Sequence, residues 1–363
     1  MIKNYFAGGN TSIGFYSLFD EVVKSLDTLY ILKGGPGSGK STFIKEVGEL
    51  FSNKGYDIDM IHCSLDSQSL DGVIVPSIKL GIIDGSRPHI VDPIYPGVKE
   101  RIIDFGEFLG MDQIKNKSTQ IIKYTDDVIK KSKLAYEQFA EAKLIHDEWE
   151  QIYLSAMNFD KANQVTADLI NSIFKEKLKR DSKQYTKKIF FGAATPEGYI
   201  HYIENITENI KKRYIIKGRP GSGKSTMMKM IAKHAEKLGL AVEVYPCGFD
   251  PNSIDMVLIP SLSVAILDGT APHVVNPDRE NDEVIDMFAL CINPEVEVNY
   301  ESALNNIESR YRIKMTIATN YIKEARSIYY KLKEYYINAM DFSALNYKKS
   351  QIVTQLSKYI EVG

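Results

Sequence analysis

The heptapeptide PGSGKST occurs twice in this chain, at positions 36–42 and 220–226, and each copy completes the spacing G-x-x-x-x-G-K-S. Glycines let successive backbone N–H groups point inward around an anion, and a helix beginning at the lysine would direct its positive end there. The lysine can reach the β- and γ-phosphates, and the serine hydroxyl can bind Mg²⁺. Each copy therefore predicts a site for a nucleoside triphosphate, with Lys40 and Lys224 as catalytic lysines. The predicted contact residues are Gly34, Gly35, Pro36, Gly37, Ser38, Gly39, Lys40, Ser41 and Thr42, and in the second copy Gly218, Arg219, Pro220, Gly221, Ser222, Gly223, Lys224, Ser225 and Thr226.

The two loops belong to a long internal duplication. Lys40 and Lys224 are 184 residues apart, and the same offset aligns further residues of the two halves without a gap. These pairs are Phe6 with Phe190, Gly14 with Gly198, Cys63 with Cys247, Asp66 with Asp250, Asp71 with Asp255, Asp84 with Asp268 and His89 with His273. Near the end of each half, AMNF at 156–159 is repeated as AMDF at 339–342. We therefore expect two tandem domains, 1–187 and 188–363, with the boundary near Lys187.

Within each half, short apolar runs alternate with helical patterns, which is typical of a parallel sheet flanked by helices. Strands of the first half are expected at residues 3–8, 29–34, 57–64 and 79–85, and the second half repeats this order. The rest of each half has apolar residues every three or four positions, the pattern of a long amphipathic helix. The predicted cores are therefore residues 1–97 and 188–294, and the predicted helical extensions are residues 98–187 and 295–363.

On these residues each half resembles a P-loop NTPase domain, with the glycine-rich loop as its Walker A motif. The whole chain also resembles a family of duplicated bacterial P-loop proteins described as ATPase-like or nucleotide-kinase-like, whose DGT-PH pattern is present as DGSRPH and DGTAPH. The resemblance implies ATP and Mg²⁺ as cofactors. GTP is disfavoured, because both candidates for the guanine-reading N/T-K-x-D motif, at 53–56 and 116–119, lack the aspartate.

A magnesium-binding aspartate is expected at the end of a core strand in such proteins. Asp84 follows LGII and Asp268 follows VAIL, so both are predicted to bind Mg²⁺ together with Ser41 and Ser225. The alternative is a simple turn, since Asp-Gly also favours turns. Glycine, rather than glutamate, follows each aspartate, which disfavours a fast ATP-hydrolysing motor and leaves the water-activating group without an obvious owner.

Two further pairs are candidates for catalysis. Asp66 and Asp250 follow the strand after the loop helix, where ligands of parallel sheets collect, and could orient a substrate hydroxyl or a metal-bound water. The alternative is a helix cap or turn. His89 and His273 follow the strand-end aspartates and could position water or contact the γ-phosphate, or could be structural.

Composition narrows the class of protein. The net charge is −2, from 45 basic and 47 acidic residues, so no global field favours nucleic acid or an anionic membrane. The three cysteines lack metal-ligand spacing, and no apolar stretch is long enough to span a bilayer. We expect a cytoplasmic protein with no membrane partner, and the composition gives no support for a nucleic-acid partner.

Three functions remain open from the sequence. The first is slow or partner-stimulated ATP hydrolysis in which the two halves work together. The second is a small-molecule or nucleotide kinase with Asp66 or Asp250 near the acceptor hydroxyl. The third is a switch or scaffold, in which nucleotide sets the position of the helical extensions and these bind a protein partner.

Overall fold

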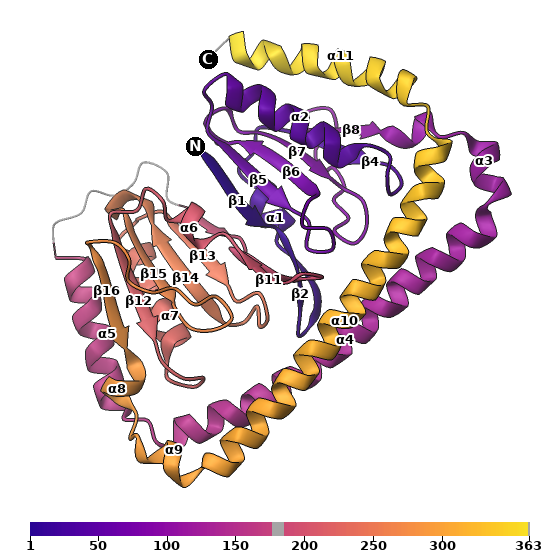
Figure 1. Ribbon diagram of the computed structural model, residues 1–363. Coiled ribbons are helices and arrows are strands. Elements are labelled where there is room, and N and C mark those ends of the chain that lie inside the picture. The colour runs from indigo at the N-terminus through magenta and orange to yellow at the C-terminus, as the bar shows by residue number, and fades with distance from the viewer. Residues whose placement is uncertain (176–184, 362–363) are drawn as a thin grey trace.

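The structure is a computed structural model that describes residues 1–175 and 185–361. It contains two α/β cores, each with a six-stranded sheet flanked by helices, and a pair of long helices that joins them along one side (Figure 1). The predicted two-domain α/β layout is therefore confirmed. The segment 176–184, which includes most of the charged run before the predicted boundary, lies outside the described residues.

The two sheets have the same strand order. The first sheet runs β1 (Ile2–Phe6), β5 (Ile58–His62), β6 (Leu70–Val75), β7 (Leu80–Asp84), β4 (Thr28–Lys33) and β8 (Glu100–Asp104). The second runs β9 (Thr186–Lys188), β13 (Val242–Pro246), β14 (Ile254–Ile259), β15 (Val264–Asp268), β12 (Lys212–Lys217) and β16 (Asp282–Asp286). The duplication read from the sequence is thus a duplication of topology.

The prediction of purely parallel sheets is wrong at one strand in each core. Strand β6 is antiparallel to both of its neighbours, and β14 repeats this arrangement, while the other pairs are parallel. The reason is the connection from β6 to β7, a single 3₁₀ turn (Pro76–Ile78) followed by Lys79 at φ 48°. A parallel pair needs a crossover of a dozen residues or more, so this short turn forces a hairpin.

The remaining elements of each core surround the sheet. The loop helices α2 (Lys40–Asn53) and α7 (Lys224–Lys237) begin at the loop lysines, as predicted. Small hairpins that the sequence did not predict follow the first strands: β2 (Gly8–Thr11) with β3 (Gly14–Ser17), and β10 (Gly192–Thr195) with β11 (Gly198–His201). Short segments complete the cores: α1 (Phe19–Val23), η2 (Phe105–Phe108), α6 (Ile203–Ile206), η3 (Pro260–Leu262), α8 (Met287–Cys291) and α9 (Glu295–Asn299).

The two cores meet around an approximate two-fold axis. Phe6 and Phe190, which are equivalent residues, exchange backbone hydrogen bonds of 2.9 and 3.0 Å. Around them one apolar cluster contains buried residues of both cores. A reciprocal pair of ion pairs flanks it, since Lys3 Nζ lies 2.5 Å from Glu243 Oε2 and Lys187 Nζ lies 2.8 Å from Asp59 Oδ2.

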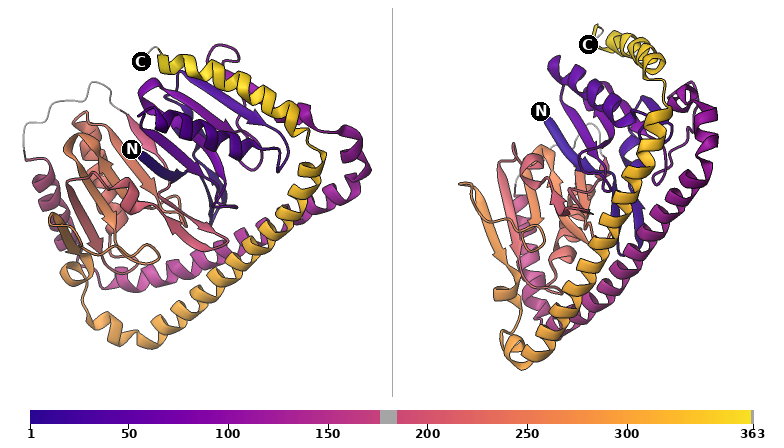
Figure 2. Two further views of the ribbon diagram at one scale, coloured as in Figure 1. Left: turned by 45° about the horizontal axis from the view of Figure 1, so that its top comes forward. Right: turned by 45° about the vertical axis from the view of Figure 1, so that its right-hand side comes forward.

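The helical extensions cross over to the opposite cores. After α3 (Met111–Asn116), α4 (Ser118–Ser155) runs away from the first core, and α5 (Phe159–Ile173) packs on the second, where Leu169 joins the apolar cluster around α7. Helix α10 (Glu301–Ala339) returns antiparallel to α4 and stays beside it in all views (Figures 1 and 2). Helix α11 (Phe342–Glu361) then covers the first core with Leu345 and Leu356. Each half therefore completes the core of the other.

Candidate functional site

Residues 34–42 (loop 1) and 218–226 (loop 2) have the same backbone conformation. Three glycines in each have positive φ, the left-handed region that other residues avoid. They are Gly34 (142°), Gly37 (78°) and Gly39 (88°) in loop 1, and Gly218 (145°), Gly221 (74°) and Gly223 (84°) in loop 2. The two copies thus have the same backbone conformation at these three glycines.

The loop lysines lie between the loop and the strand-end aspartates. Lys40 Nζ donates to the carbonyl oxygen of the first loop glycine at 2.8 Å, and Asp84 Oδ2 is 3.6 Å away. Lys224 repeats both distances with its own loop and with Asp268. The pairing is geometric in origin, because β4, which leads into loop 1, is a direct parallel neighbour of β7, which ends at Asp84.

The predicted magnesium ligands each accept hydrogen bonds from nearby groups, and Asp268 accepts one from the Thr270 hydroxyl as well as one from its backbone N–H. The Ser41 and Ser225 hydroxyl oxygens accept the first backbone N–H of β6 (2.8 Å) and of β14 (3.0 Å). Asp84 and Asp268 accept, through Oδ1, the backbone N–H two residues later, at 2.8 and 2.9 Å. The Asp-Gly turn considered from the sequence is therefore present, and it leaves Oδ2 of each aspartate directed to the loop lysine.

A second carboxylate that the sequence reasoning did not select lies beside each strand-end aspartate. Gly72 of β6 pairs with Ile83 of β7. Asp71, just before Gly72, and Asp84, just after Ile83, therefore lie at the same end of these two neighbouring strands. Burial raises the pKa of Asp71 to about 6, although His89 opposes the rise. Asp255 is the buried equivalent in the second core. The signal available in the sequence is the identity of this aspartate in the two copies.

The candidate histidines pack against these buried aspartates. His89 stacks on Phe19 with ring centroids 4.4 Å apart, and its Nδ1 is 3.9 Å from Asp71 Oδ2. His273 Nε2 is 3.2 Å from Asp255 Oδ2. Burial alone would lower the pKa of His273, but the hydrogen bond and charge of Asp255 raise it. Both imidazoles are therefore buried at this end of the sheet, His89 beside Asp71 and His273 beside Asp255.

The candidate aspartates after β5 and β13 contact helices from the opposite half. Asp66 accepts hydrogen bonds from Ser69 Oγ (2.9 Å), Tyr330 Oη (3.1 Å) and Lys333 Nζ (2.9 Å). Burial alone would raise the pKa of Asp66, but these bonds hold it below its usual value. Asp250 lies 3.5 Å from Lys143 of α4. Sequence reasoning could not find these partners, since nothing in the amphipathic pattern shows which core a helix will cover.

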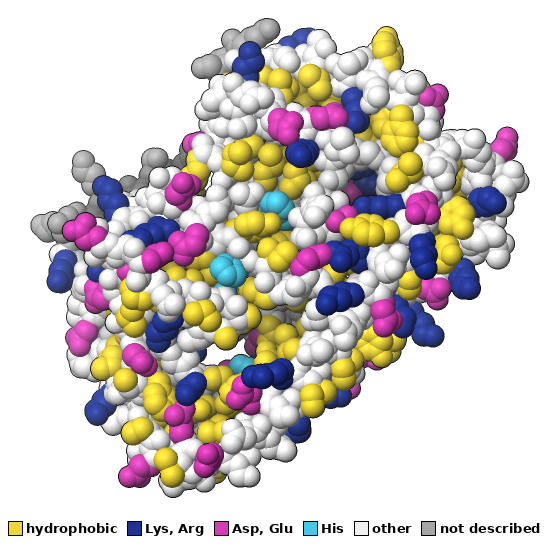
Figure 3. Space-filling view, in the orientation of Figure 1, with side chains coloured by type: hydrophobic (Ala, Val, Ile, Leu, Met, Phe, Trp, Pro, Cys, Tyr) yellow, Lys and Arg dark blue, Asp and Glu magenta, His cyan; other side chains and the backbone are white. Residues whose placement is uncertain are grey.

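The last turns of α10 and α4 lie directly on the glycine loops. A Cβ at Gly37 would stand 3.0 Å from the Lys333 carbonyl oxygen, and a Cβ at Gly221 would stand 2.6 Å from that of Glu150. Glycine is therefore required in the loops for close helix approach as well as for backbone conformation. Figure 3 shows the surface hollowed between the second core and the long helices, with acidic and basic side chains at the edge of the hollow.

Comparisons with protein-family models, curated proteins and solved structures find no match to this chain. Among the described residues, no helix is both long and apolar enough to cross a membrane.

Proposed function

We propose that this protein binds ATP and Mg²⁺ at both glycine loops and hydrolyses ATP slowly or in response to a partner, with the two halves acting together. The observation that carries the proposal is the arrangement of Lys40 between loop 1 and Asp84, repeated by Lys224 with loop 2 and Asp268. A glycine loop with three positive φ angles that is followed directly by a helix of 14 residues, present in both halves, favours phosphate over a structural turn.

The lysines are placed to exchange partners when phosphate arrives. In this conformation each ammonium group donates to the carbonyl oxygens of its own loop. A phosphate oxygen carries negative charge, so it attracts the ammonium group more strongly than a neutral carbonyl oxygen does. Lys40 and Lys224 would then neutralise charge on the phosphates while the loop N–H groups and the helix N-terminus hold them.

The oxygen donors beside the lysines fit Mg²⁺, which prefers carboxylate and hydroxyl ligands. Asp84 Oδ2 is beyond hydrogen-bond distance from Lys40, and Ser41 accepts only one hydrogen bond, so both keep lone pairs for a cation. Asp268 and Ser225 provide the same donors in the second core. Bound Mg²⁺ would supply positive charge to the β- and γ-phosphate oxygens.

The contact between loops and helices favours a second function, a nucleotide-dependent switch. Lys333 touches loop 1 through its carbonyl oxygen and Asp66 through its ammonium group. A ligand that changes loop 1 would therefore bias the position of α10, provided that it binds the two positions with different affinity. The antiparallel pairing of α10 with α4 would carry such a movement to loop 2, and the helical pair is the surface that we propose for a protein partner.

The test compares wild type with Lys40→Ala, Lys224→Ala and the double variant. Binding of a fluorescent ATP analogue and phosphate release are measured on the same samples with Mg²⁺. Each single variant should bind the analogue about 10- to 100-fold more weakly at the altered loop, because the substitution removes a bond between the lysine and a charged phosphate. The double variant should bind at neither loop.

Lys45→Ala is the matched control, because this exposed lysine lies on α2 and, within the described part of the chain, forms an ion pair only with Glu49 in the next turn. It should leave binding unchanged. Wild-type affinity in the double variant would contradict the proposal. Binding without phosphate release, even over long incubation, would contradict hydrolysis and leave the switch.

A further inference from the structure

The two loop sites differ in what the opposite half places over them. The repeat AMNF and AMDF puts α4 and α10 in register with an offset of 183 residues, so Glu150 and Lys333 occupy equivalent positions. Both residues touch the loop below through their backbone, Glu150 at Gly221 and Lys333 at Gly37. The same point of each site therefore carries opposite charges.

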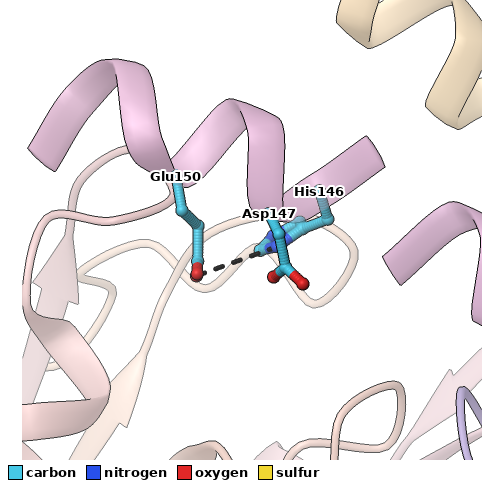
Figure 4. A group of neighbouring side chains, drawn as sticks. All are labelled: His146, Asp147 and Glu150. Carbon is cyan, nitrogen blue, oxygen red and sulfur yellow. Dashed lines mark ion pairs between the residues drawn. The ribbon is translucent and has the colours of Figure 1, made fainter. Parts of the chain in front are cut away.

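The residues around these positions differ as well. Over loop 2, α4 presents His146, Asp147 and Glu150, which project from one side of the helix (Figure 4). Their ligand atoms lie within 4.8 Å of one another, and His146 Nδ1 is 3.7 Å from Glu150 Oε1. Over loop 1 the equivalent positions of α10 hold two tyrosines and a lysine, at 329, 330 and 333.

A divalent metal is not the best explanation of this group. The Lys143 ammonium group forms an ion pair with Asp147 and lies 3.5 Å from Asp250, so a cation already stands among the carboxylates. Glu150 is the carboxylate that Lys143 does not pair with directly. Its only ion-pair partner among the described residues is His146, and burial lowers the pKa of that imidazole, which favours the neutral ring.

Glu150 also has the electrostatic setting of a proton acceptor. Burial raises the pKa of its carboxyl, while Lys143 opposes the rise. The other charged groups that face it are Asp147 on α4, Asp250 after β13 and Lys224 on α7. A carboxylate with a raised pKa takes a proton more readily, which is what a general base near neutral pH requires.

We infer that Glu150 is the catalytic base at loop 2, supplied by the other half of the chain, and that loop 1 holds ATP without hydrolysing it. This inference depends on the proposed binding of ATP at both loops. The water oxygen forms a bond to the γ-phosphorus, and the bond from that phosphorus to the β–γ bridging oxygen breaks. ADP keeps the electron pair, and the proton leaving the water passes to the Glu150 carboxylate and then to solvent.

At loop 1 the equivalent position holds Lys333, which cannot accept a proton while it is charged. Its ammonium group is bonded to Asp66, and that aspartate also accepts from Tyr330. The described residues of α10 at this site therefore offer cation and phenol groups where α4 offers carboxylates and an imidazole. After duplication, loop 2 has a group that can activate water for attack on ATP, whereas loop 1 has groups that only retain the nucleotide.

The experiment uses Glu150→Gln, which keeps the size of the side chain. Glu148→Gln is the control, because Glu148 lies on the same helix but pairs with Arg310 of α10. Each protein is incubated with Mg²⁺ and ATP, freed of unbound nucleotide, and its bound nucleotides are separated by chromatography. Phosphate release, binding of a fluorescent ATP analogue and melting temperature are measured alongside.

Wild type and Glu148→Gln should carry ADP and ATP together, and Glu150→Gln should carry ATP alone. Phosphate release should fall by about 100-fold or more in Glu150→Gln, the usual contribution of a general base, with binding and melting temperature unchanged. Lys224→Ala should release no phosphate while loop 1 retains ATP.

Three results would overturn the inference. Glu150→Gln could release phosphate at the wild-type rate, Lys224→Ala could retain about half of the turnover, or Glu150→Gln could lose binding and turnover together. In each case wild type still binds and hydrolyses ATP, so the proposed function stands. Absence of nucleotide binding in wild type would remove both.

Discussion

Loop 1 and loop 2 have the same backbone conformation, but the residues that surround them differ. The glycine φ angles and the lysine contacts agree between the copies to within a few degrees and a few tenths of an ångström. The helix over loop 1 contributes Tyr330 and Lys333, whereas the helix over loop 2 contributes Asp147 and Glu150. The comparison teaches that duplication has preserved the groups expected to grip phosphate and has allowed the groups supplied by the opposite half to diverge.

The seam between the long helices explains why divergence was possible. Ala135 and Phe139 of α4 pack against Ala318 and Ile322 of α10, so the buried face of each helix is fixed by its partner. The residues directed at the loops lie nearer the C-terminal end of each helix and outside this apolar cluster. A change there alters the chemistry of one site without altering the frame that holds both.

The largest expected difference between the sites concerns Gly221 and Gly37. Alanine at either position must adopt a left-handed φ, which costs about 1–2 kcal/mol. At Gly221 the new Cβ also meets the Glu150 backbone at 2.6 Å, whereas at Gly37 the nearest atom, at 2.8 Å, belongs to the side chain of Ile337. We expect Gly221→Ala to lower the free energy of unfolding by about 3 kcal/mol and Gly37→Ala by about 2 kcal/mol, measured by urea denaturation.

Gly55→Ala is the control for this pair, because its φ is 85° and a Cβ there would meet nothing within 4 Å. It should cost about 1 kcal/mol, the conformational part alone. Equal costs at Gly55 and Gly221 would show that α4 does not rest on loop 2.

The second prediction compares the lysines that reach the candidate aspartates. Lys333→Met removes the ammonium group from Asp66, a buried carboxylate that keeps the Ser69 and Tyr330 hydroxyl donors, and should cost about 2 kcal/mol. Lys143→Met breaks a longer and more hydrated contact with Asp250 and should cost about 1 kcal/mol or less. Thermal unfolding of both variants at one ionic strength measures the difference, and the reverse order would contradict a tighter helix contact at loop 1.

The smallest expected effect is a pH dependence specific to loop 1. The folded protein holds the pKa of Asp66 below its usual value of 3.8, so the carboxylate stabilises the fold above that pH. This contribution is lost as pH falls through the lower, folded-state pKa, because both states then bind the proton. The melting temperatures of wild type and Asp66→Asn should therefore differ at pH 7 and converge well below pH 4.

The Lys333→Met background provides the control for the pH experiment. Without its strongest partner, Asp66 should lose most of the depression of its pKa, and the pH dependence of the difference should shrink. A difference that persists unchanged in strong acid would mean that Asp66 acts through packing rather than through charge.

The parts of each site that are close together in the sequence could be predicted, whereas the residues contributed by the helix of the opposite half could not. The loops, the helices after them and the position of Asp84 depend on neighbouring residues, and these were predicted correctly as structure. The antiparallel β6 was missed because its apolar run, LDGVIV, is short and has no clear alternation, so a strand was expected only after it, at residues 79–85. The contacts of Lys333 and Glu150 could not be predicted, because the amphipathic pattern shows which face of a helix is buried but not which part of the protein covers that face.

The exchange of α5 and α11 has a consequence for the order in which the protein can fold during synthesis. The last strand of the first sheet ends at Asp104, yet Leu345 and Leu356, which cover its apolar cluster, belong to α11. At usual elongation rates these residues leave the ribosome on the order of 10–50 s after the strand. The first core is therefore translated first and completed last, and in that interval its exposed apolar face is a natural place for a chaperone to bind.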